Sequence, residues 1–134
     1  MTTAVFLDTV GLLGLWNRRD QWHAAAKRAF DELVAAETRL VTTPLVLLEC
    51  GNAAARHPFR QLVVHLREEL RAAGDLLEPT AAELDSAWAA YARGEAAEAG
   101  IVDHVSFVVM RREGLAQVFS NDEHFRIAGF ETLF

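Results

Sequence analysis

A short apolar run near the start of the chain, Ala4 to Leu7, ends abruptly in the carboxylate of Asp8. A strand that is buried on both faces of a parallel sheet reads as a continuous apolar run of this kind. Four later segments have a similar strand-like character, at 39–42, 75–79, 117–120 and 130–134. They alternate with longer segments of helical periodicity, which predicts a parallel sheet with helices on both faces.

The helical segments carry recognisable start and stop signals. Thr43-Pro44 is a hydroxyl N-cap followed by proline at the first helical position, and Thr80-Ala81-Ala82-Glu83 matches a capping box. Thr9 is expected to cap the first helix, and Gly74 to end the fourth. The predicted helices span about 9–16, 21–38, 43–56, 59–73, 80–93, 103–114 and 123–128, and 94–100 is expected to be a connection of small and acidic residues.

Length and composition suit one globular domain over residues 1–134, because 51% of the 134 residues are hydrophobic. Cys50 is the only cysteine, which excludes an internal disulfide and suits a reducing cytoplasm. No apolar stretch approaches the roughly 20 residues that a membrane span needs, and the N-terminus lacks the pattern of a secretory signal. We therefore expect a soluble, cytoplasmic protein.

The formal net charge of −6 argues against a protein that holds nucleic acid by a broad basic face. The charge is compatible with a nucleic-acid enzyme, since metal ions bound by clustered carboxylates can supply positive charge locally. The same acidic balance would suit a basic protein partner.

Three further carboxylates, Glu49, Asp103 and Asp122, interrupt or border apolar segments, as Asp8 does. Ligands collect beyond the carboxyl ends of parallel strands, where Asp8 and Asp122 are expected. Glu49 lies in an otherwise apolar helix, so it should lose hydration unless its charge is paired or coordinates a cation. Asn52, three residues further on, shares the face of Glu49 and could orient it. Convergence on one hard divalent cation explains the four acids together, because Mg²⁺ prefers oxygen ligands.

Each acid also has an ordinary structural explanation. Glu49 could pair with an arginine such as Arg56. Asp103 heads a helix, where the dipole and free amides favour an acid. Asp8 could be a simple cap and Asp122 a turn residue. Four scattered histidines are expected to lie on the surface or to pack: His23, His57, His65 and His124.

Four acidic motifs in this order resemble those of the PIN-domain nucleases, and in particular the VapC-like toxins of bacterial toxin–antitoxin pairs. The resemblance covers nearly the whole chain. Its motifs are Val5-Phe6-Leu7-Asp8-Thr9, Thr43-Pro44-Leu45-Val46-Leu47-Leu48-Glu49, Val102 to Arg111, and Ser120-Asn121-Asp122-Glu123-His124-Phe125 followed by Ala128-Gly129-Phe130. It implies a three-layer α/β/α sandwich whose central, mostly parallel sheet has about five strands.

The resemblance also implies roles for particular residues. The acidic quartet of Asp8, Glu49, Asp103 and Asp122 would bind Mg²⁺ or Mn²⁺ and be catalytic. The hydroxyls of Thr9 and Ser120 would hold the first and last acids or a water, as Asn52 would orient Glu49. His104 follows Asp103 at a position where the family is expected to have a small residue.

These features predict a metal-dependent endoribonuclease that hydrolyses RNA phosphodiesters. In such a site the attacking group is an activated water, so no side-chain nucleophile is needed. The resemblance further implies that the protein is the toxin of a type II pair, is silenced by a small antitoxin and forms a homodimer. Two alternatives remain open from the sequence: a structure-selective DNA nuclease, and a non-catalytic PIN-like binding module.

Overall fold

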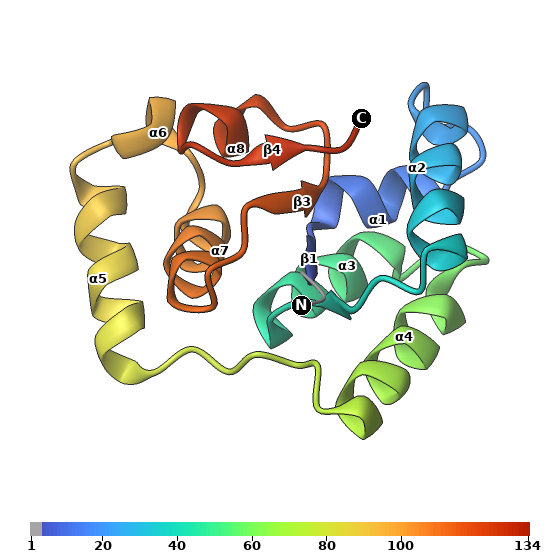
Figure 1. Ribbon diagram of the computed structural model, residues 1–134, viewed down its shortest axis with the longest axis horizontal. Coiled ribbons are helices and arrows are strands. Elements are labelled where there is room, and N and C mark those ends of the chain that lie inside the picture. Colours follow the sequence, from blue (N-terminus) through green and yellow to red (C-terminus); the bar gives the residue numbers. More distant parts are fainter. Residues whose placement is uncertain (1–3) are drawn as a thin grey trace.

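The computed structural model describes residues 4–134 and contains a central sheet of four strands in the order β2-β1-β3-β4. The strands are β1 (Val5–Leu7), β2 (Leu40–Val41), β3 (Gln117–Phe119) and β4 (Glu131–Thr132). Every neighbouring pair is parallel. In the view of Figure 1 the sheet lies in the middle of the molecule, with α5 and α7 on one side and α1, α2 and α4 on the other. This is the predicted three-layer arrangement, with β4 at the edge.

The third of the five predicted strands, at 75–79, does not form. Only one parallel bridge joins it to the sheet, between Thr42 and Leu76. Two observations explain the early end of pairing. Pro79 has no N–H to donate to a ladder, and the Glu78 carbonyl instead accepts a hydrogen bond from the Arg112 guanidinium at 3.1 Å.

Helices begin and end close to the predicted positions. The capping box at Thr80 and Glu83 is confirmed, with bonds of 2.8 and 3.1 Å, and the Thr43 hydroxyl caps its helix by accepting from the Val46 N–H at 3.4 Å. Gly74 ends the fourth helix in the left-handed conformation, at φ 75°. The helices are α1 (Thr9–Trp16), α2 (His23–Ala35), α3 (Pro44–Ala54), α4 (Arg60–Ala73), α5 (Ala81–Ala92), α6 (Glu95–Glu98), α7 (Ile101–Arg112) and α8 (Glu123–Ile127). None of these described helices is long and apolar enough to cross a membrane.

The predicted connection at 94–100 contains the short element α6. Its backbone is left-handed at Ala96, Ala97 and Glu98, with φ values of 53°, 55° and 60°. Three consecutive non-glycine residues in this region are unfavourable by roughly 1–2 kcal/mol each. A helical pattern in the sequence could not have predicted this turn, because nothing in it favours the left-handed region except Gly94.

Strand β3 and helix α1 approach each other unusually closely at Gly11. A Cβ placed there would lie 2.1 Å from the Phe119 carbonyl oxygen and 2.7 Å from its ring. Phe119 is fully buried in the core, and the closest of these atoms belongs to its backbone. This close approach allows α1 to start directly at the end of β1.

We expect Gly11→Ala to lower the free energy of unfolding by about 3 kcal/mol, because the added methyl group meets backbone rather than a flexible side chain. Urea unfolding monitored by circular dichroism measures this change. Gly14→Ala is the matched control in the same helix: its Cβ would meet only the Ala26 Cβ, at 3.5 Å. Equal midpoints for the two variants would contradict the steric explanation.

Candidate active site

The site lies beyond the carboxyl ends of β1 and β3. Leu7 pairs with Phe119 in the sheet, so the residues that follow these two strands lie beside each other. The Ser120 hydroxyl donates to Asp8 Oδ2 at 2.8 Å and accepts from the Asp122 N–H at 3.0 Å. Ser120 therefore links the first and last acids of the predicted quartet through one buried hydroxyl.

Asp8 is the most buried of the four acids, with 1% of its surface exposed. It also caps α1, because its Oδ2 accepts the Val10 N–H at 3.2 Å. The expectation that Thr9 caps this helix is therefore wrong. Burial, together with the charges of Asp103 and Asp122, raises the pKa of Asp8 to about 7, although the hydrogen bonds from Ser120 and Val10 act in the opposite direction.

Glu49 is exposed on α3, so the expectation that it loses hydration inside an apolar helix is wrong. The buried face of α3 carries Val46, Leu47 and Cys50, and the helical turn places Glu49 away from it. Its Oε1 accepts from the Thr9 hydroxyl at 2.6 Å. Thr9 thus holds the second acid of the quartet rather than the first.

Neither of the two residues considered as partners of Glu49 forms a polar bond with it among the described residues. Asn52 is exposed, and among the hydrogen bonds of residues 4–134 there is none from its amide to Glu49. The described part of the chain likewise has no ion pair between Glu49 and Arg56. Among the described residues the hydrogen bond that orients Glu49 comes from Thr9, and the role expected for Asn52 stays a prediction.

Asp103, Asp122 and His124 form a compact cluster. One potential ligand atom from each lies within 4.8 Å of the others, and all three side chains are half-buried. Asp103 comes from the first turn of α7 and Asp122 caps α8, where its Oδ1 accepts from the His124 N–H at 2.9 Å. The same Oδ1 lies 2.7 Å from the His124 Nδ1. Asp8 and Glu49 border this cluster without belonging to it.

His124 was expected to be a surface or packing residue, and the structure instead places it against Asp122. The bond to Asp122 raises the pKa of His124 above its ordinary value, as do the charges of Asp122 and Asp103. The sequence signal that could have identified it is its position two residues after the acid that caps a helix. Such spacing lets the side chain return to its own cap.

The four carboxylates lie close enough to repel one another. Burial raises the pKa of Asp103 to about 6, and the charges of Asp122 and Glu49 add to this, while His124 opposes it. Asp8 is affected by both Asp103 and Asp122. Mutual repulsion among carboxylates is relieved when a cation binds between them, and carboxylate oxygens are the ligands that Mg²⁺ and Mn²⁺ prefer. The donor set therefore fits a hard divalent cation.

Comparisons with known proteins agree over nearly the whole chain. The family model of the PIN domain matches residues 5–131. The 23S rRNA-specific endonuclease VapC20 of Mycobacterium tuberculosis, in strains CDC 1551 / Oshkosh and H37Rv, is 30% identical over 132 residues, covering 94% of this chain and 95% of the relative. The crystal structure of M. tuberculosis VapC20, described as a sarcin-ricin loop cleaving toxin, superposes with a TM-score of 0.78 at 28% identity, covering 96% of this chain and 97% of that chain.

Proposed function

This chain belongs to the PIN-domain family, and we propose on that basis that it is a metal-dependent endoribonuclease acting as the toxin of a type II toxin–antitoxin pair. The observation that carries the proposal is the cluster of Asp103 and Asp122, bordered by Asp8 and Glu49, in which burial and repulsion between the carboxylates raise the pKa of Asp8 to about 7 and that of Asp103 to about 6. Such an arrangement is unfavourable without a cation. The VapC20 relatives are named for cleavage of ribosomal RNA, which favours RNA over DNA as the substrate.

The proposed cation ligands are Asp8, Glu49, Asp103 and Asp122, with Mg²⁺ or Mn²⁺ as the ion. Such an ion lowers the pKa of a water and offsets negative charge on a phosphodiester during in-line attack. The chain's own groups fix the ligands: Ser120 fixes Asp8, and Thr9 fixes Glu49. Preorganised ligands need no rearrangement when substrate arrives, so these hydroxyls are positioning residues.

We infer four further properties from the same membership. A small antitoxin would be the natural protein partner, and the net charge of −6 suits a partner with a basic segment. The chain would act as a single domain over 1–134, as a homodimer, and in the cytoplasm.

The direct test uses purified protein, a panel of RNA and DNA oligonucleotides of matched sequence, and buffers with Mg²⁺ or EDTA. We expect RNA to be cut only with Mg²⁺ and DNA to remain intact. Cleavage of DNA at the rate of RNA would favour the structure-selective DNA nuclease instead. No cleavage, together with no Mg²⁺ binding by calorimetry, would favour a non-catalytic module.

Ser120→Ala should slow RNA cleavage by about tenfold to hundredfold, because groups that orient metal ligands have effects of that size. The variant removes both the bond to Asp8 and the bond to the Asp122 N–H. Thr42→Val is the matched control, since it deletes another buried hydroxyl, bonded to the Leu7 carbonyl at 2.6 Å, that touches no acid. Equal losses in the two variants would mean that Ser120 acts only through stability.

A further inference from the structure

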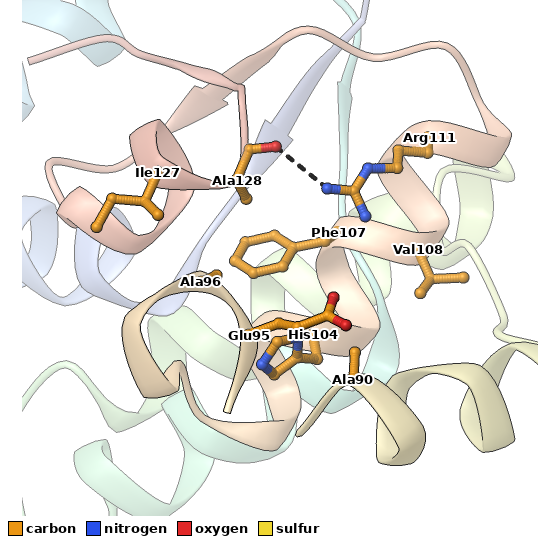
Figure 2. Close-up of a pocket in the computed structure, with 9 residues that line it drawn as sticks. All are labelled: Ala90, Glu95, Ala96, His104, Phe107, Val108, Arg111, Ile127 and Ala128. Carbon is orange, nitrogen blue, oxygen red and sulfur yellow. Dashed lines mark hydrogen bonds between the residues drawn. The ribbon is translucent and has the colours of Figure 1, made fainter. Parts of the chain in front are cut away.

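A cavity of about 320 Å³ lies between α5, α6, α7 and α8. Its size is at the small end of the ~300–1,000 Å³ typical of ligand pockets. Six of its nine lining residues are apolar, Phe107 among them, but polar atoms make up about half of the exposed lining. Three polar side chains also face it: Glu95, His104 and Arg111. Figure 2 shows Glu95 and His104 on one side of the Phe107 ring and Arg111 on the other.

The cavity and the acidic cluster share two helices, α7 and α8. On α7, Phe107 lies one helical turn after Asp103, so the two residues share a face. On α8, Ile127 and Ala128 lie three and four residues after His124 and line the same cavity. One helical turn rises about 5.4 Å. A nucleic-acid strand whose phosphate lies at the acids can therefore place a neighbouring group in this cavity.

His104 supplies an unused hydrogen-bonding atom. The residue is 3% exposed, and its Nε2 is buried without a hydrogen-bond partner among the described residues. Its ring is held edge-to-face against Tyr91 and Phe107, at centroid distances of 6.3 and 5.5 Å. A buried nitrogen without a partner is costly, and its retention is explained if a ligand completes the bond.

Arg111 and Glu95 define what that ligand can be. The Arg111 guanidinium donates to the Ala128 carbonyl at 3.1 Å and lies over the Phe130 ring at 5.4 Å, which holds its plane in place. A fixed guanidinium plane is a surface on which bases stack. Glu95 pairs with Arg93, and its carboxylate can only accept hydrogen bonds. Its negative charge, together with that of the nearby acids, disfavours the binding of a free anion in the cavity.

We propose that this cavity binds an unpaired nucleobase of the RNA, next to the phosphate that is cut. The inference rests on the proposed function and names a determinant of its specificity. A lining that is part apolar and part polar, with one stacking cation and one carboxylate, suits a flat heterocycle with polar edges rather than a phosphate or a peptide carboxylate. Guanine fits the polar groups best, because its adjacent N–H donors match the Glu95 carboxylate and its O6 acceptor matches the Nε2–H donor of one neutral His104 tautomer.

The test is cleavage of a randomised single-stranded RNA library by the full chain with Mg²⁺, followed by sequencing of the product ends. We expect the parent to favour guanine at one position beside the cut by about tenfold to hundredfold. His104→Ala and Glu95→Gln should flatten the preference at that position alone, whereas the base preferences at all other positions stay as in the parent.

Glu98→Gln is the matched control, because Glu98 is an exposed acid of the same element that does not line the cavity. Glu95→Gln alters an exposed side chain, so it remains informative if His104→Ala melts at a lower temperature. If the base preference is unchanged both in Glu95→Gln and in folded His104→Ala, the proposal is overturned. This is the result expected if the cavity receives a protein side chain instead of a base. A parent that cuts without preference at any position also overturns the proposal. If the parent cuts no RNA at all, the proposed function itself is contradicted. The oligonucleotide panel with Mg²⁺ or EDTA identifies that result separately.

Discussion

Asp8→Asn should reduce RNA cleavage by at least about a hundredfold to a thousandfold while leaving the fold intact. Both hydrogen bonds to the Asp8 side chain, from the Ser120 hydroxyl and the Val10 N–H, go to one oxygen, Oδ2. An asparagine amide oxygen can accept both, so the cap and the link to β3 survive. What the variant loses is the negative charge that a cation needs.

The measurement is the initial rate of RNA cleavage in saturating Mg²⁺, together with a circular dichroism spectrum. Asp103→Asn should give a loss of similar size, since its carboxylate belongs to the compact cluster with Asp122. Asp85→Asn, an exposed acid of α5, is the matched control and should cut at the parental rate. If Asp8→Asn cut as fast as the parent, the assignment of the acidic site would be wrong.

The metal-free protein should lose stability as the pH rises from about 4 to 7. The pKa of Asp8 is about 7 in the folded chain, against an ordinary value of 3.8. The folded state therefore holds this proton more tightly than the unfolded state, and its stabilising effect disappears as the pH rises through the folded pKa. A shift of that size corresponds to at most about 4 kcal/mol. Asp103, with a pKa of about 6, acts in the same direction.

Asp8→Asn should remove most of this dependence, and at pH 8 in EDTA it should be more stable than the parent by about 2 kcal/mol. Mg²⁺ at about 100 times its dissociation constant should then stabilise the parent by about 2.7 kcal/mol and the variant by much less. Urea unfolding of the parent and of Asp8→Asn at pH 5 and pH 8, with EDTA or Mg²⁺, measures the pH dependence of stability and the stabilisation by Mg²⁺ for both proteins. A parent whose stability is independent of pH would contradict the burial of an ionised Asp8, and Asp85→Asn should behave like the parent throughout.

Activity and stability are thus expected to oppose each other at Asp8. The carboxylate that is most unfavourable in the empty site is the one that gains most when a cation binds. This opposition distinguishes a functional acid from an ordinary cap, because a cap replaced by asparagine would leave both stability and activity nearly unchanged.

Local patterns in the sequence were sufficient to predict the fold class and most element boundaries. Helix caps such as Thr43 and the Thr80 capping box depend on neighbours within three residues, so the chain carries their signal directly. The alternation of apolar runs and helical periods predicted a parallel sheet, and the family motifs predicted the four acids. The strand at 75–79 was the main error, since a short apolar run does not reveal whether its carbonyls will find another donor.

The sequence by itself determined which residues carry charge near the strand ends, because strand and helix periodicity are local properties. Only the tertiary structure decided how those residues contact one another. The bond from Ser120 to Asp8 joins residues 112 positions apart, and that from Thr9 to Glu49 joins residues 40 apart. Both depend on how β1 pairs with β3 and how α1 packs on α3, and so do the exposure of Glu49 and the cavity beside His104. Such contacts follow from register and packing across the whole chain, which no local pattern encodes.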